Sequence, residues 1–129
     1  MPIDIRSVES LTREQFRRLG IAFCYRLGCD RNDKRLAKAL KRLEKSLGPP
    51  PNEKFRREAF NAANSAYLDL CRKNGKTSYV ACTLVCACWD GPTPNLLGNF
   101  ITALVENESL SHGQAREIGS QILSSVLEG

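Results

Sequence analysis

The chain has little of what catalysis and membrane insertion require. It contains a single histidine and a single tryptophan, and its longest uncharged stretches, residues 77–89 and 91–105, fall well short of the ~20 apolar residues that span a bilayer. The opening segment MPIDIRSVES lacks the charged and apolar regions of a secretory signal. We therefore expect a cytoplasmic protein without a membrane partner.

Few residues are placed to act as an acid, a base or a nucleophile. The one histidine, His112, is expected in the first turn of a helix, where the positive end of the helix dipole disfavours its protonated form. No glycine-rich loop has phosphate-binding spacing. A Cys–His pair with Cys24 or Cys29 is the remaining route to catalysis, and no motif supports it. The sequence predicts that the protein is not an enzyme and uses no cofactor.

The cysteines include no C-x-x-C pair, the spacing most typical of a metal or redox centre. Cys82 and Cys86 lie one helical turn apart and could share a metal with Cys71, Cys88 or His112, but Cys88 projects about 200° away from Cys86 on a helix. The missing secretory signal and the long helical patterns favour reduced thiols. We expect no metal site and six small packing residues, which are Cys24, Cys29, Cys71, Cys82, Cys86 and Cys88.

Acidic residues are scarce in the first part of the chain. Residues 1–76 carry 18 Lys/Arg and nine Asp/Glu, whereas residues 77–129 carry one arginine and five acids. The net charge of +5 therefore hides a basic part of +9 and an acidic part of −4. Arginine outnumbers lysine by 12 to 7, which favours forked recognition of phosphate or carboxylate. An anionic partner for the basic part is the natural expectation.

Apolar residues recur with a helical period along the chain, and no segment alternates convincingly as a strand would. The sequence therefore predicts a single all-α domain over residues 1–129, a compact bundle of about six helices. We expect a basic helical hairpin over residues 12–48, a proline spacer over 49–51 and a four-helix remainder over 52–129. Residues 78–89 carry no charge on any side, so they should form the buried central helix.

Capping residues set the expected helix starts. Thr12 with Gln15, and Ser111 with Gln114, have the spacing of a capping box. The other expected N-caps are Asn32 or Asp33, Asn52, and Thr93 followed by Pro94 at the first helical position.

Two aromatic residues each allow two interpretations. Trp89, at the end of the apolar helix, is expected in the core with its N–H satisfied, with an interface anchor as the alternative. Tyr25 is expected to behave similarly, although its position near several arginines would let it stack on a base if the basic surface binds single strands.

The most informative segment is 33–48, DKRLAKALKRLEKSLG. On a helix, Leu36, Leu40, Leu43 and Leu47 form a narrow apolar stripe. Glu44 is the only carboxylate between positions 34 and 45, so the helix forgoes the i,i+4 pairs that usually stabilise a solvated surface. The cations lie opposite the leucines in an acid-free arc of roughly 120°. These cations are Lys34, Arg35, Lys38, Lys41, Arg42 and Lys45.

The basic arc predicts a small binding protein that contacts a nucleic-acid backbone without sequence specificity, because no base-reading motif accompanies the charge. The alternative is a protein–protein adaptor that docks an acidic partner through the same surface, and a plain solvated surface is the third interpretation. A homodimer would double the basic surface. If the hairpin packs through its apolar stripes, the footprint widens to Arg13, Arg17 and Arg18 on the first helix and to Lys54, Arg56 and Arg57 on the third.

Overall fold

The computed structural model describes residues 10–73, 75–89 and 94–128, and over these residues it is built of seven α-helices without a strand. This confirms the all-α prediction. The helices are α2 (Arg13–Arg26), α3 (Cys29–Asn32), α4 (Lys34–Lys45), α5 (Glu53–Arg72), α6 (Thr77–Ala87), α7 (Pro94–Glu108) and α8 (His112–Glu128).

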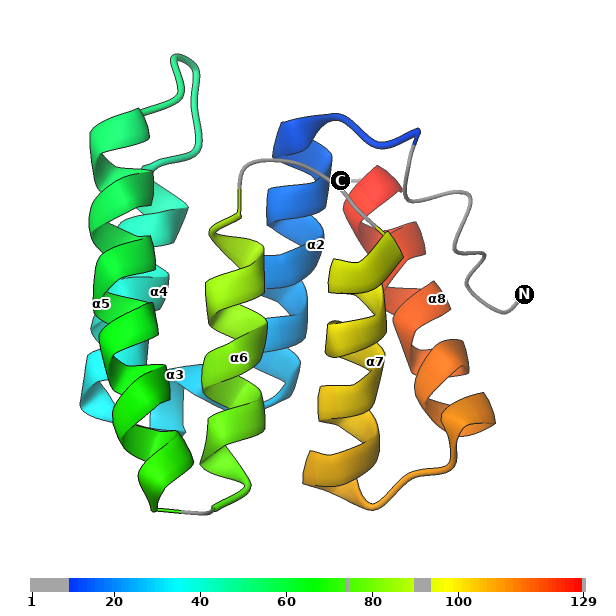
Figure 1. Ribbon diagram of the computed structural model, residues 1–129. Coiled ribbons are helices and arrows are strands. Elements are labelled where there is room, and N and C mark those ends of the chain that lie inside the picture. The colour runs from blue at the N-terminus through cyan, green and yellow to red at the C-terminus, as the bar shows by residue number, and fades with distance from the viewer. Residues whose placement is uncertain (1–9, 74, 90–93, 129) are drawn as a thin grey trace.

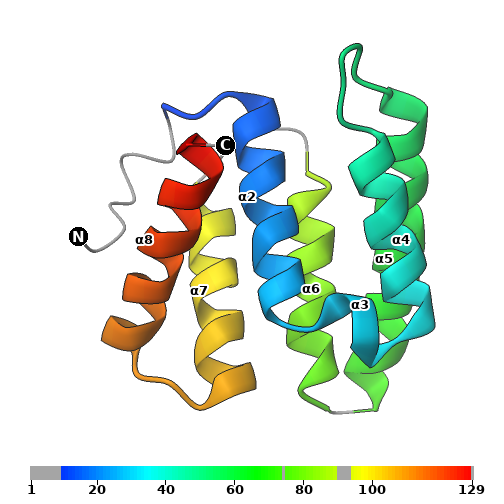
Figure 2. The same cartoon turned by 180° about the vertical axis from the view of Figure 1, so that it is seen from behind.

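The helix that the sequence did not predict is α3, a single turn between α2 and α4. Gly28 precedes it with a φ of +78°, a left-handed conformation that glycine adopts without a steric penalty. The side-chain amide of Asn32 donates to the carbonyl of Leu27 at 3.1 Å and closes this turn. The turn reverses the chain, so α4 runs antiparallel to α2 (Figures 1 and 2).

Helix α6 lies at the centre of the bundle, as its lack of charge predicts. It contacts α5 on one side and α2 and α7 on the other, while α8 covers α2 and α7 (Figures 1 and 2). Helix α4 packs most extensively against α5 and only slightly against α2. Helices α2 and α4, which correspond to the predicted hairpin, are therefore antiparallel but pack mainly on different helices. Helix α4 packs mainly on α5, and α2 packs mainly on α6 and α8.

The expected caps form where the structure describes them. The Gln15 amide donates to Thr12 Oγ1 at 3.1 Å, and the Thr12 amide donates to Gln15 Oε1 at 2.9 Å. Ser111 and Gln114 repeat this capping box at the start of α8. Asp33 and Asn52 cap α4 and α5, and Pro94 is the first residue of α7. The predicted cap Thr93 lies outside the described residues.

Aromatic rings and a glycine hold α2 against α6 and α7. Phe100 packs on Phe16 and Phe23, with ring centroids 5.6 and 5.1 Å apart. Gly20 faces Ala87 so closely that a Cβ on Gly20 would lie 2.5 Å from the Ala87 Cβ. The core side of α2 therefore includes Phe16, Leu19, Gly20 and Phe23.

The cysteine prediction holds for four of the six residues. Cys24, Cys29, Cys86 and Cys88 are buried, Cys82 is half-buried and Cys71 is exposed; all six are free thiols. Burial raises the pKa of Cys24, and it raises the pKa of Cys88 to about 12, as expected for thiols that serve as apolar packing. Cys71 is exposed because it lies in the last turn of α5, where residues 71–73 are all exposed.

Two aromatic residues that the sequence predicts to lie in the core are exposed at the surface. Trp89 is 50% exposed because it follows the last turn of α6, beyond the packed part of that helix. Tyr25 is 40% exposed on α2, where its hydroxyl donates to Glu44 of α4. None of the described helices combines the length and hydropathy needed to cross a membrane.

Candidate functional site

Four lysines of α4 form one exposed line, which we call the lysine stripe: Lys34, Lys38, Lys41 and Lys45. Their spacing of four, three and four residues places them within about 60° of the helix circumference and along roughly 17 Å of its length. The opposite side of α4 is buried through Leu36, Leu40 and Leu43. Across residues 10–73, 75–89 and 94–128, no carboxylate forms an ion pair with any of the four.

The two arginines of α4 behave differently from its lysines. Arg35 Nη1 lies 3.0 Å from Asp69 Oδ2 on α5, and Arg35 Nη2 lies 3.1 Å from Asp33 Oδ2. Its guanidinium donates to Asp33 and to Asp69, which lowers the pKa of both carboxyls. Arg42 Nη1 lies 3.6 Å from Glu58 Oε2, and the guanidinium carbon lies 4.9 Å from the centroid of the Phe55 ring. These arginines tie α4 to α5.

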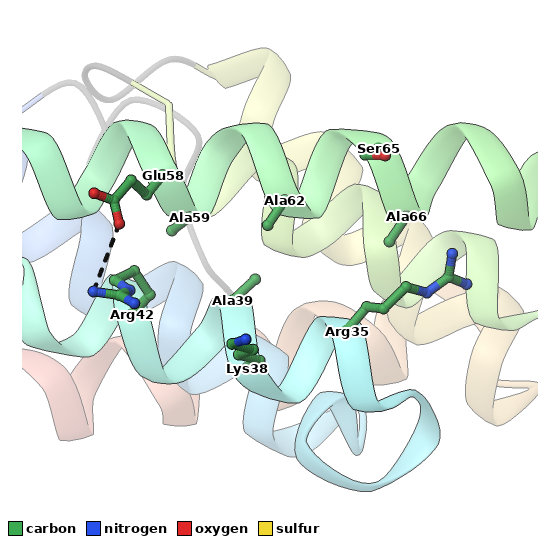
Figure 3. Close-up of a pocket in the computed structure, with 9 residues that line it drawn as sticks. All are labelled: Arg35, Lys38, Ala39, Arg42, Glu58, Ala59, Ala62, Ser65 and Ala66. Carbon is green, nitrogen blue, oxygen red and sulfur yellow. Dashed lines mark ion pairs between the residues drawn. The ribbon is translucent and has the colours of Figure 1, made fainter.

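A groove of about 380 Å³ runs between α4 and α5. Figure 3 shows Arg35, Lys38 and Arg42 along its α4 edge, and Arg42 and Glu58 pointing toward each other. The groove is also lined by small residues from both helices, Ala39, Ala59, Ala62, Ser65 and Ala66. Because its arginines are paired with carboxylates, the excess positive charge of α4 lies on the lysine stripe beside the groove.

The single acid of α4 points away from the stripe. Glu44 accepts a hydrogen bond from the Tyr25 hydroxyl on α2, and this bond raises the pKa of Tyr25 to about 12. Glu44 and Tyr25 line a hollow of about 360 Å³ that also includes Arg18 and reaches Val126 of α8. The carboxylate is therefore engaged on the α2 side of α4, and it does not neutralise the lysines.

Two residues predicted for the basic surface are not available there. Arg17 is only 6% exposed, on a helix against which α6 and α8 both pack. The side chain of Arg56 is 13% exposed, donates from Nε to Glu53 at 2.9 Å and donates from Nη1 to the carbonyl of Cys88 at 2.8 Å. Both arginines lower the pKa of the Cys88 thiol against the larger effect of burial, which raises it.

The remaining predicted cations are exposed but lie on other helices. Arg18 pairs with Glu14 at 3.4 Å, one turn back on α2, and Arg13 begins the same helix. Lys54 and Arg57 are exposed on the first turns of α5, and neither forms an ion pair within the part of the chain that the structure describes. The single basic field of the prediction therefore resolves into the lysine stripe and separate smaller groups.

One surface feature was missed by sequence reasoning. Trp89 packs on Phe60 of α5 with ring centroids 6.0 Å apart and planes inclined by 54°. A pocket of about 260 Å³ is formed there together with Arg56, Arg57 and Asn61. The signal for its exposure is the Asp-Gly-Pro sequence directly after Trp89, because such residues end a helix and leave the preceding side chain beyond the packed turns.

Among the described residues, no group of three or more His, Cys, Asp or Glu side chains is arranged to hold a metal ion. The described surface offers a line of cations on α4 and an aromatic pocket between the start of α5 and the end of α6. Comparisons with protein-family models, with curated proteins and with solved structures found no match to this chain.

Proposed function

We propose that the lysine stripe binds the phosphate backbone of a nucleic acid without reading its sequence. The observation that carries this proposal is the contrast within α4: the arginines are paired with carboxylates of α5 and of their own N-cap, while the four lysines are exposed and free of ion pairs within the described residues. A helix surface that keeps like charges together sacrifices stability, and binding to a polyanion offsets that cost.

Lysine suits this role because its ammonium is a compact, mobile charge that neutralises phosphates without demanding one fixed geometry. A stripe of roughly 17 Å lies beside about ten phosphates of a B-form duplex, which carries one charge per ~1.7 Å. Backbone contacts of this kind position a protein and carry no direct sequence information. The proposed activity is therefore binding of nucleic acid without sequence preference. The lysine stripe makes the contacts, and the wider set of arginines predicted from the sequence does not.

The proposal is tested by fluorescence anisotropy with a labelled duplex and a labelled single strand at several salt concentrations. If four phosphates are neutralised, the slope of log affinity against log salt should be about −3.6 for the duplex and about −2.8 for the single strand. The variant K38Q/K41Q/K45Q should reduce the duplex slope by about 2.7. No binding of either form at low salt would overturn the proposal.

A matched control separates the stripe from net charge. The variant R72Q/K76Q/R116Q removes three exposed cations that lie outside α4, so both triple variants have the same net charge. The proposal requires the stripe variant to lose far more affinity than the control. Equal losses would mean that total charge alone attracts the strand. Tighter binding of poly-glutamate than of nucleic acid at matched charge would instead support the adaptor function.

A further inference from the structure

The end of the bundle where α4 finishes is also the place where α5 begins and α6 ends (Figure 1). Helix α5 packs against α4 on one side and against α6 on the other. This end of the bundle therefore carries four residues from three helices: Lys45 at the end of the stripe, Lys54 and Arg57 on the first turns of α5, and Trp89 just after α6. Helix α6 also makes a small direct contact with α4.

One side of the pocket at Trp89 is held in place by hydrogen bonds, and the residues on its other side are exposed. Arg56 forms the side that is held in place, because its guanidinium donates to Glu53 and to the carbonyl of Cys88. Arg57 is exposed and has no carboxylate partner among the described residues, while Asn61 is exposed one turn further along α5. Trp89, supported from one side by Phe60, offers a large aromatic surface that is half exposed.

We propose that this pocket stacks an unpaired base of a single strand whose backbone follows the lysine stripe; the inference rests on the proposed function. Tryptophan stacks on any base because every base has a π-face, and arginine and lysine beside it hold the adjoining phosphates. A duplex cannot use the pocket, since the faces of its bases are already stacked on their neighbours. The protein therefore prefers single strands to duplexes of equal charge.

The occupant is argued from charge and shape together. An acidic peptide would satisfy Lys54 and Arg57 but would leave the aromatic surface uncovered, whereas a nucleotide carries both an anion and a flat ring. Asn61 adds a donor and an acceptor at the pocket edge, suited to the polar rim of a base. The same residues define no preference for one base, which agrees with a protein that does not read sequence.

The single tryptophan makes the test direct, because all tryptophan fluorescence arises from Trp89. The full-length protein is titrated with a thymine oligonucleotide, with an abasic strand of the same length, and with a duplex, and each labelled strand is also followed by anisotropy. We expect all three to bind, and only the strand with unpaired bases to quench Trp89 strongly. The expected affinity gain of that strand over the abasic strand is about 5- to 150-fold.

The two proposals fail in different ways in this experiment. If no strand changes the anisotropy at low salt, backbone binding itself is wrong. If the base-bearing and abasic strands bind equally and quench equally, backbone binding stands and the stacking inference is overturned. Quenching by poly-glutamate, with displacement of the single strand, would also overturn the inference and assign the pocket to an acidic protein.

A matched pair of variants locates the effect. Tyr79 is a second exposed aromatic residue of α6, near the opposite end of that helix. W89A should remove the preference for the base-bearing strand and leave duplex binding unchanged, while Y79A should change neither. W89F should retain part of the preference and serves as the test if W89A fails to fold by circular dichroism. Equal behaviour of W89A and Y79A would overturn the inference.

Discussion

Arg56 Nη1 donates to the main-chain carbonyl of Cys88 at 2.8 Å, although the two residues are 32 positions apart. The bond joins the first turn of α5 to the C-terminal end of α6, where helix carbonyls lack partners and the helix dipole favours a cation. The same guanidinium donates to Glu53. A residue predicted to contact a ligand is therefore a bridge between two helices.

Replacing Arg56 with methionine should destabilise the fold by about 1–3 kcal/mol, because a charge-assisted hydrogen bond is lost and the Cys88 carbonyl is left without that donor. Urea unfolding followed by circular dichroism measures this. R72Q, which removes an exposed cation at the other end of α5, is the control and should change the free energy of unfolding by less than about 0.5 kcal/mol. Equal effects of R56M and R72Q would contradict the bridging role.

Removing the carboxylates that occupy the α4 arginines should strengthen nucleic-acid binding. The variant E58Q/D69N leaves Arg42 without a carboxylate partner on α5 and leaves Arg35 paired with Asp33 alone. The added positive field beside the lysine stripe should raise affinity about two- to tenfold at low salt. The stability loss should be small, because all the ion pairs that are removed, including that of Lys73 with Asp69, are partly exposed.

The control for this gain changes charge by the same amount elsewhere. E106Q/E117Q removes two exposed carboxylates from α7 and α8, on the acidic part of the chain. Anisotropy titrations at matched salt compare the two variants. A similar gain from E106Q/E117Q would show that net charge, and not the neighbourhood of α4, governs binding.

Local features of the fold were predictable from the sequence because they depend on residues three or four positions apart. Both capping boxes, the Asp33 and Asn52 caps and the uncharged central helix are of this kind. The extra turn α3 was missed because one left-handed glycine, Gly28, both ends α2 and starts the next helix.

The candidate site was only partly predictable, since a helical wheel shows which residues share a side but not what faces them. The predicted arc treated the lysines and arginines of α4 as one group. Arg35 differs from the lysines because it pairs with Asp69, which is 34 positions away in the sequence. Arg17 was assigned to the surface by its charge, yet it is buried in the fold. These facts depend on packing between distant segments, which composition and periodicity do not contain.

The Tyr25–Glu44 hydrogen bond should make stability depend on pH at the alkaline end. The pKa of Tyr25 is raised from 10.0 to about 12, so the folded state holds this proton more tightly than the unfolded state. The stabilisation is fully present below pH ~10 and is lost as the pH rises toward about 12. The difference in unfolding free energy between the native chain and Y25F should therefore shrink across this interval.

The same bond can be tested on the phenol itself. E44Q replaces the acceptor carboxylate by a neutral amide, so the pKa of Tyr25 should fall toward its ordinary value of 10.0. Nuclear magnetic resonance of the labelled tyrosine ring follows this titration residue by residue. An unchanged pKa in E44Q would show that burial, and not Glu44, raises it.

The close approach of α2 and α6 gives the sharpest stability prediction. An added methyl at Gly20 would lie 2.5 Å from the Cβ and 2.9 Å from the Cα of Ala87, and Phe100 would be 3.2 Å away. The backbone contact means that α2 and α6 must separate, so G20A should destabilise the protein by about 1–3 kcal/mol. Thermal and urea unfolding both report this loss.

Gly98 provides the matched control, because it is also a helical glycine but has nothing within 4 Å of its added Cβ. It is exposed in the interior of α7, where alanine is a better helix former than glycine. G98A should therefore stabilise the protein by about 0.5–1 kcal/mol, opposite in sign to G20A. If both substitutions stabilise the fold, α2 and α6 do not meet at Gly20, and the central position of α6 between its neighbours is wrong.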